Sequence, residues 1–150
     1  MRQGGLWHPS LVELIVSMRH YDTIVIADAG LPVPANVPTI ELGWQRREPR
    51  LLPVLSAVLG ELVVEQATIA NEVADPELLE GLQKQLRGLP IVRTPHDALK
   101  ASCGDARAVI RTGEDTPFAN VILHAGVPFP SVPASHLSNG HEATQGRLAP

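Results

Sequence analysis

Cysteine and aromatic residues are scarce in this sequence. Its 150 residues include a single cysteine, and aromatic side chains make up only 3% of the chain. Because Cys103 has no partner, the chain cannot form an internal disulfide, which agrees with a reducing compartment. With so few large rings available, aliphatic side chains must supply most of the hydrophobic core.

The sequence also lacks a strong excess of charge of either sign. It has 12 basic and 16 acidic residues, which give a formal net charge of −4. Neutralisation of phosphates by basic residues dominates affinity for nucleic acids. The sequence has no basic stripe or arginine-rich arm that could supply it. We therefore expect no nucleic-acid partner.

Long uninterrupted apolar runs are absent as well. Polar residues, among them Arg2 and Glu13, interrupt the N-terminal segment, so we expect no signal peptide. The most apolar region, residues 51–70, contains Pro53, Glu61 and Glu65, which excludes a plain membrane span. These features predict a soluble, cytoplasmic protein with no membrane partner.

Common cofactor and nucleophile motifs do not occur. There is no Gly-x-x-x-x-Gly-Lys loop, no Gly-x-Gly-x-x-Gly, no Gly-x-Ser-x-Gly elbow and no Cys-x-x-Cys. His20, Asp28, His96 and His124 are side chains of the types that bind metals, but no two of them have a close metal-binding spacing. We therefore predict neither a cofactor nor a metal site.

The first half of the chain alternates between helical and strand patterns. Ser10 and Glu13 have the spacing of a capping box, which predicts a helix over residues 10–19. The continuous apolar run 23–27 is typical of a strand buried on both faces. A short strand is expected at residues 39–42, and Pro49 suits the first turn of a helix that ends near Leu59. Residues 62–73 are ambiguous, and we favour a strand.

The alternation continues in the second half. Asp75 and Pro76 predict a helix cap and a first helical residue, and Gly88 is expected to stop that helix. Strands are predicted at residues 89–93, 108–111 and 120–123, and a short helix is predicted to begin with Thr94 as cap and Pro95 as first residue. We expect a single α/β domain over residues 1–129, with helices packed on a mostly buried sheet, and a C-terminal tail or arm over residues 130–150.

Several polar residues lie at the ends of these elements, where ligands gather in α/β folds. His20 follows a helix and can exchange a proton near neutral pH, but a helix C-terminus also favours a surface histidine. Asp28 either caps a turn or binds a ligand, and His96 and Asn120 have comparable structural explanations. Glu114 is expected to be a solvated loop charge, as is its neighbour Asp115.

Taken in order, these segments resemble the D-ribose pyranase and L-fucose mutarotase family, and most closely its ribose branch. The matching segments are His20-x-Asp22-Thr23, Asp28-Ala29-Gly30-Leu31-Pro32-Val33-Pro34, Glu61-x-x-Val64-Glu65-x-Ala67, Thr94-Pro95-His96-Asp97, Ile110-Arg111-Thr112-Gly113-Glu114, Pro117-Phe118-Ala119-Asn120 and Ala125-Gly126-Val127. They extend from the N-terminus to about Phe129 in the order found in the family, without large gaps.

The resemblance implies an RbsD-like fold and an isomerase that interconverts the ring forms of ribose or a related sugar without a cofactor. On this basis His20 is the catalytic acid/base. The resemblance also implies that the sugar is held by Asp28, His96, Asn120 and the backbone around Phe118 and Ala119. Lys100 is a weaker candidate for the same contact. Members of the family form homo-oligomeric rings with sites where subunits meet.

Two residues depart from the family pattern. Phe118 replaces the usual tyrosine, so a phenolic hydroxyl is missing, and Arg19 replaces the glycine that usually precedes the histidine. Two alternatives therefore stay open beside a ribose-type isomerase. One is a mutarotase for another monosaccharide such as L-fucose, and the other is a transport-associated protein that binds sugar without turnover.

Overall fold

The computed structural model describes residues 1–129, so the predicted tail over residues 130–150, with His136 and His141, lies outside the described residues. Within that range the chain forms helices and strands in alternation. The helices are α1 (Pro9–Ser17), α2 (Leu51–Leu59), α3 (Pro76–Gln85) and α4 (His96–Ser102), which continues into a short 3-10 helix (Cys103–Asp105). The strands are β1 (Thr23–Ala27), β2 (Thr39–Glu41), β3 (Val64–Ala70), β4 (Ile91–Thr94), β5 (Ala108–Arg111) and β6 (Val121–Ala125).

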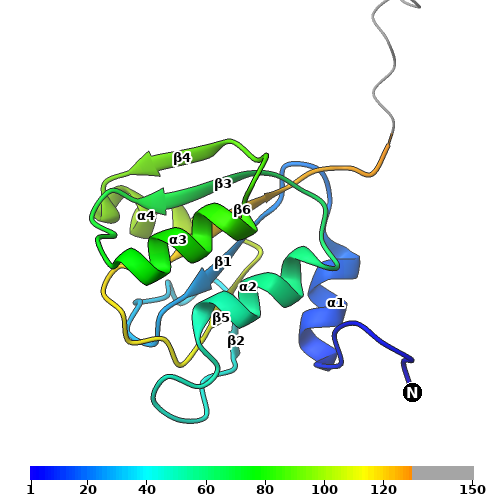
Figure 1. Ribbon diagram of the computed structural model, residues 1–150. Coiled ribbons are helices and arrows are strands. Elements are labelled where there is room, and N and C mark those ends of the chain that lie inside the picture. Colours follow the sequence, from blue (N-terminus) through cyan, green and yellow to red (C-terminus); the bar gives the residue numbers. More distant parts are fainter. Residues whose placement is uncertain (130–150) are drawn as a thin grey trace, which may run out of the picture.

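The strands form one mixed sheet in the order β2-β5-β1-β6-β3-β4. The pairs β2–β5, β5–β1 and β3–β4 are parallel, whereas β6 runs antiparallel to both β1 and β3. The carboxyl ends of five strands therefore meet the start of β6 at one edge of the sheet, which we call the carboxyl edge; the arrowheads of β3 and β4 point to it in Figure 1. The opposite edge, where β1 and β3 begin and β6 ends, is the amino edge.

The centre of the sheet is dry and aliphatic. Ile24, Val25 and Ile26 of β1 are each 0% exposed, because helices cover both faces of the sheet: α2 and α3 lie in front of it and α4 behind it in Figure 1. Cys103 is free and buried in the same core, and burial raises the pKa of its thiol. The predicted α/β fold, with helices packed on a mostly buried sheet, is confirmed.

The predicted cap of α3 is confirmed, but that of α1 is wrong. The Asp75 side chain accepts a hydrogen bond from the backbone N–H of Leu78 at 2.8 Å. α1 instead begins at Pro9, with His8 as the N-cap residue and no side-chain cap bond. Because the fixed φ of proline suits the first helical position, the helix starts before Ser10 and removes that residue from the capping position.

Two other helices begin later than predicted. α2 starts at Leu51, after a cis peptide bond between Glu48 and Pro49. α4 starts at His96, whereas Thr94 remains in β4 and caps nothing. Pairing of β4 with β3 holds Thr94 opposite Ala70 and keeps it extended. The ambiguous segment 62–73 contains strand β3, as we favoured.

In the part of the chain that the structure describes, no helix is long and apolar enough to cross a membrane.

The observed starts of α3 and α1 give a paired prediction for stability. Asp75→Ala removes a cap bond and should lower the free energy of unfolding by about 1 kcal/mol. Ser10→Ala removes no cap bond and should change it by less than about 0.5 kcal/mol. Urea unfolding at one fixed protein concentration measures both, and an equal loss in the two variants would contradict this account of the helix starts.

Candidate active site

Asp28 and Asn120 form a reciprocal pair at the carboxyl edge. The backbone N–H of Asp28 donates to Asn120 Oδ1 at 3.0 Å, and Asn120 Nδ2 donates to Asp28 Oδ2 at 2.9 Å. Asp28 Oδ1 accepts from the backbone N–H of Gly30 at 2.9 Å, so this residue also closes the turn after β1. Asn120 is only 1% exposed, so its amide orients the Asp28 carboxylate from within the protein.

His96 and Phe118 lie beside this pair. Nε2 of His96 is 3.5 Å from Asn120 Nδ2, and the His96 and Phe118 rings meet edge to face with centroids 5.0 Å apart. Phe118 has a φ of 62°, an uncommon left-handed conformation for a bulky residue, and its side chain remains 37% exposed. Ala119 is 1% exposed. The structure thus brings together all five residues expected to hold a sugar; we call them the carboxyl-edge cluster.

A carboxylate at the start of α4 fixes His96. The Glu72 oxygens accept the backbone N–H of His96 at 2.9 and 3.0 Å, which satisfies a free donor at the helix N-terminus. Lys100, one turn later, forms an ion pair with Asp97 at 2.8 Å.

Glu114 is the anchor of the loop that carries Phe118 and Asn120. Its side chain is 2% exposed and accepts hydrogen bonds from Arg50 Nε at 3.1 Å and from the Leu51 backbone N–H at 3.1 Å. The Thr116 backbone N–H and hydroxyl donate to its other oxygen at 3.1 and 2.8 Å. The prediction that Glu114 is a solvated loop charge was therefore wrong, because the loop folds its carboxylate onto the N-terminus of α2.

These contacts also determine the ionisation of Glu114. Burial by itself would raise the pKa of this carboxyl. The hydrogen bonds from Arg50, Thr116 and the Leu51 N–H outweigh burial and lower the pKa to about 2. Its neighbour Asp115, in contrast, remains partly exposed and pairs with Arg46.

His20 lies at the amino edge, apart from the carboxyl-edge cluster. Its Nε2 is 2.9 Å from Glu65 Oε2, and its ring stacks on Tyr21 with centroids 3.7 Å apart. β1, which has five residues, separates His20 from Asp28, and at about 3.3 Å per residue this is about 16 Å. Within one chain His20 therefore cannot touch a ligand held by the carboxyl-edge cluster.

Arg19 does not extend over His20. Its guanidinium Nη1 donates to the carbonyls of Val16, Ser17 and Met18 at 3.0–3.2 Å, so it lies against the C-terminus of α1. A cation there is also stabilised by the helix dipole.

The described residues contain no group of three or more histidine, cysteine, aspartate or glutamate side chains that could hold a metal ion. His124 Nε2 lies 3.1 Å from Thr68 Oγ1, and burial lowers the pKa of this imidazole.

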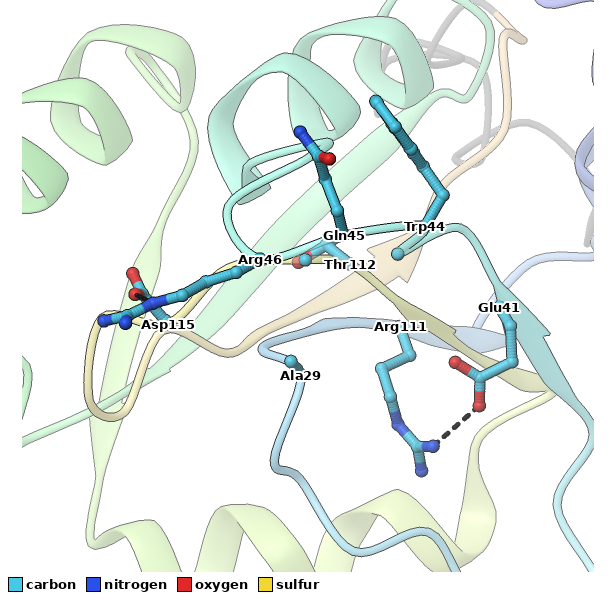
Figure 2. A pocket seen from close by; sticks show the side chains of 10 residues that line it. Ala29, Glu41, Trp44, Gln45, Arg46, Arg111, Thr112 and Asp115 are labelled. Atoms are coloured by element: carbon cyan, nitrogen blue, oxygen red, sulfur yellow. Dashed lines mark hydrogen bonds and ion pairs between the residues drawn. The ribbon is translucent and has the colours of Figure 1, made fainter.

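A hollow of about 390 Å³ lies beyond the ends of β2 and β5. In Figure 2, Arg111 points downward and pairs with Glu41, whereas Trp44 and Gln45 point upward. None of the residues predicted to hold a sugar lines this hollow. Its lining does include Ala29, which directly follows Asp28 in the chain.

Sequence reasoning missed the roles of three glutamates. Glu65 contacts His20, Glu72 caps α4 and Glu114 anchors the loop. Glu65 and Glu114 stood inside the segments that carry the family resemblance, which was the available signal for them. Glu72 gave no signal, because its partner is 24 residues away.

An ordered carboxylate, a buried amide, an imidazole and an exposed aromatic ring at a sheet edge are typical of small α/β proteins that bind small polar ligands. A family model described as "RbsD / FucU transport protein family" matches residues 1–128. The chain belongs to this family.

Several relatives match over most of the chain. A D-ribose pyranase from Geobacillus kaustophilus is 44% identical over 87% of this chain and 98% of its own length. A D-ribose pyranase from Coprothermobacter proteolyticus is 45% identical over 86% of this chain and 100% of its own. The structure of Bacillus subtilis RbsD complexed with D-ribose aligns with a TM-score of 0.83 and 37% identity, over 86% of this chain and 100% of that one. A fucose mutarotase from Streptococcus pneumoniae, at 23% identity and a TM-score of 0.70 over 80% of this chain and 93% of that one, shares the fold.

The buried Glu114 carboxylate gives a prediction for stability against pH. Because its pKa is lowered from 4.5 to about 2 on folding, it stabilises the protein above about pH 4.5, and this stabilisation disappears as the pH falls to about 2. We expect Glu114→Gln to cost about 2 kcal/mol at neutral pH, a value reduced for solvent screening because the Arg50 side chain is 31% exposed. Urea unfolding between pH 2 and 7 should show the wild-type and variant curves converging towards low pH.

Glu41→Gln is the matched control for this experiment. Glu41 is 56% exposed and pairs with Arg111 at the surface, so its loss should cost less than about 1 kcal/mol. A constant gap between wild type and Glu114→Gln across the whole pH range would contradict the role given to the carboxylate.

Proposed function

We propose that this protein is an isomerase that interconverts the pyranose and furanose forms of D-ribose, or of a closely related aldose, by acid/base-catalysed ring opening. One observation carries the proposal: Asp28, His96 and Asn120 converge at the carboxyl edge in a chain 37% identical to a protein solved with D-ribose. Several curated relatives that are 41–45% identical over most of the chain are D-ribose pyranases. We place the activity in the cytoplasm, where a free cysteine such as Cys103 stays reduced.

The carboxyl-edge cluster has the donors and acceptors that a sugar requires. The Asp28 carboxylate accepts hydrogen bonds from hydroxyl groups, and the Asn120 amide holds it in one orientation. The exposed face of Phe118 offers an apolar surface to the C–H groups of the ring. Such positioning lowers the entropic part of the barrier.

Ring exchange combines proton transfers with the cleavage of one C–O bond and the formation of another. The anomeric hydroxyl loses a proton, the bond from the anomeric carbon to the ring oxygen breaks, and that oxygen gains a proton. Closure through a different hydroxyl reverses these steps and changes the ring size. A positioned acid/base contributes about 10²–10⁴-fold to such a step, and His20 is the group proposed for it.

We also propose that His20 reaches the sugar from a second copy of the chain. A strand of about 16 Å separates it from the carboxyl-edge cluster in its own chain, which is too far for one sugar to touch both. Its side chain is 36% exposed at the amino edge and is free to face a neighbour. A closed homo-oligomeric ring satisfies this geometry, because every amino edge then meets the carboxyl edge of the next subunit.

Loss of His20 tests the activity directly. Saturation-transfer NMR measures the exchange rate between ribose ring forms in the presence of wild type, His20→Ala and the control variant His8→Ala. We expect acceleration by wild type and by His8→Ala, and a return to the uncatalysed rate with His20→Ala.

Other outcomes point to the alternatives. Sugar binding without faster exchange of any ring form would favour a transport-associated binding protein. Phe118, which lacks the phenolic hydroxyl, would then be the relevant residue. Faster exchange of L-fucose but not of ribose would favour a mutarotase.

A site shared between subunits predicts complementation. His20→Ala and Asp28→Asn should each be inactive alone, because each removes one half of the site. Co-expression should restore about a quarter of the wild-type activity, since about a quarter of randomly formed interfaces combine two intact halves. Assemblies as inactive as the separate variants would contradict a site shared between subunits.

A further inference from the structure

Glu65 is the hydrogen-bond partner of His20 at the amino edge. Its Oε2 lies 2.9 Å from His20 Nε2, and the two residues are 45 positions apart in the sequence. Their side chains are 36% and 42% exposed, so both lie at the surface of the protein.

This contact determines which imidazole nitrogen carries the proton. An ionised carboxylate only accepts hydrogen bonds, so Nε2 of His20 must be the N–H donor. In the neutral imidazole the other nitrogen, Nδ1, then has the free lone pair. Nδ1 is then the ring atom with a lone pair for accepting a proton, while Nε2 keeps its own.

The fold holds the carboxylate in place. Glu65 lies at the position where the pairing of β3 with β6 shifts register, between Val64 and Gln66, and such a bulge re-aims a side chain. Opposite it, a Cβ built on Gly126 would lie 3.3 Å from Glu65 Cβ, so the absence of a side chain at Gly126 gives Glu65 its room. His124, on the paired strand, directs its Nε2 to Thr68 instead.

Tyr21 constrains the same imidazole from its face. The two rings are nearly parallel, with an interplanar angle of 17° and centroids 3.7 Å apart. Tyr21 itself has a φ of 69°, which lies in the left-handed region and turns the chain sharply before β1. Glu65 thus binds Nε2 and Tyr21 covers one face, and the ring as a whole remains 36% exposed.

We propose that Glu65 is a positioning residue for His20, which fixes the Nε2–H tautomer and leaves Nδ1 as the proton-exchanging atom. This inference rests on the proposed function for its effect on rate, but its structural part concerns the free protein alone. Glu65 does not contact the sugar in this scheme. Its loss should therefore lower kcat and leave KM nearly unchanged.

Two readouts on Glu65→Gln test the proposal. Ribose exchange should show kcat reduced about 10- to 100-fold, the range found when carboxylate partners of metal-binding histidines are removed, with KM within about twofold of wild type. Long-range ¹⁵N NMR of histidine-labelled protein reports the tautomer, and the His20 signals are those lost in His20→Ala. The Nε2–H form should dominate in wild type and lose that dominance in Glu65→Gln.

Control variants separate positioning from a general loss of structure. Glu65→Asp retains a carboxylate and should recover part of both kcat and the tautomer preference. Glu61→Gln removes a nearby carboxylate that binds Arg2 and the Leu6 N–H instead, and should leave kcat unchanged.

An unchanged tautomer in Glu65→Gln would overturn the proposal, as would a variant whose only change is a higher KM. If wild type fails to accelerate ribose exchange, the proposed function fails. The tautomer measurement then still decides whether Glu65 fixes His20.

Discussion

The buried carboxylate of Glu114 is the constraint on which the carboxyl edge depends. A charge that is 2% exposed must be fully hydrogen-bonded, and Glu114 meets this need with donors from Arg50, the first residue of α2 and its own loop. Its backbone carbonyl also accepts the N–H of Ala29, which joins the loop to the turn after β1. The positions of Asp28 and Asn120 follow from this connection, because each lies next to a segment that Glu114 holds.

The antiparallel strand β6 explains how residues 92 positions apart form one cluster. Because β6 begins beside the end of β1, Asn120 meets Asp28 at the carboxyl edge. The same pairing brings Ala125, at the end of β6, to the turn before β1, where it accepts the N–H of Tyr21. Each chain thus has the carboxyl-edge cluster on one edge of the sheet and the contact between His20 and Glu65 on the opposite edge. The proposed site between two copies of the chain depends on this placement on opposite edges.

Local chemistry made some elements predictable and others not. Asp75 capped α3 as predicted because the cap bond spans three residues and needs no tertiary partner. Ser10 failed as a cap because Pro9 took the first helical position. Thr94 failed because strand pairing kept it extended, and Glu72, from a distant turn, satisfied the helix start in its place. Glu114, which we predicted from the sequence to be a solvated charge, is the most buried carboxylate in the described part of the chain.

The sequence by itself determined the α/β class, most helix and strand positions and the residues of the carboxyl-edge cluster. Hydrophobic periodicity, helix caps and family motifs each depend on residues that are close together along the chain. Only the tertiary structure decided that His20 lies apart from that cluster, that Glu65 is its partner and that Glu114 is buried. These facts depend on which strand ends meet at which edge of the sheet, and strand order and direction are set by packing of the whole domain.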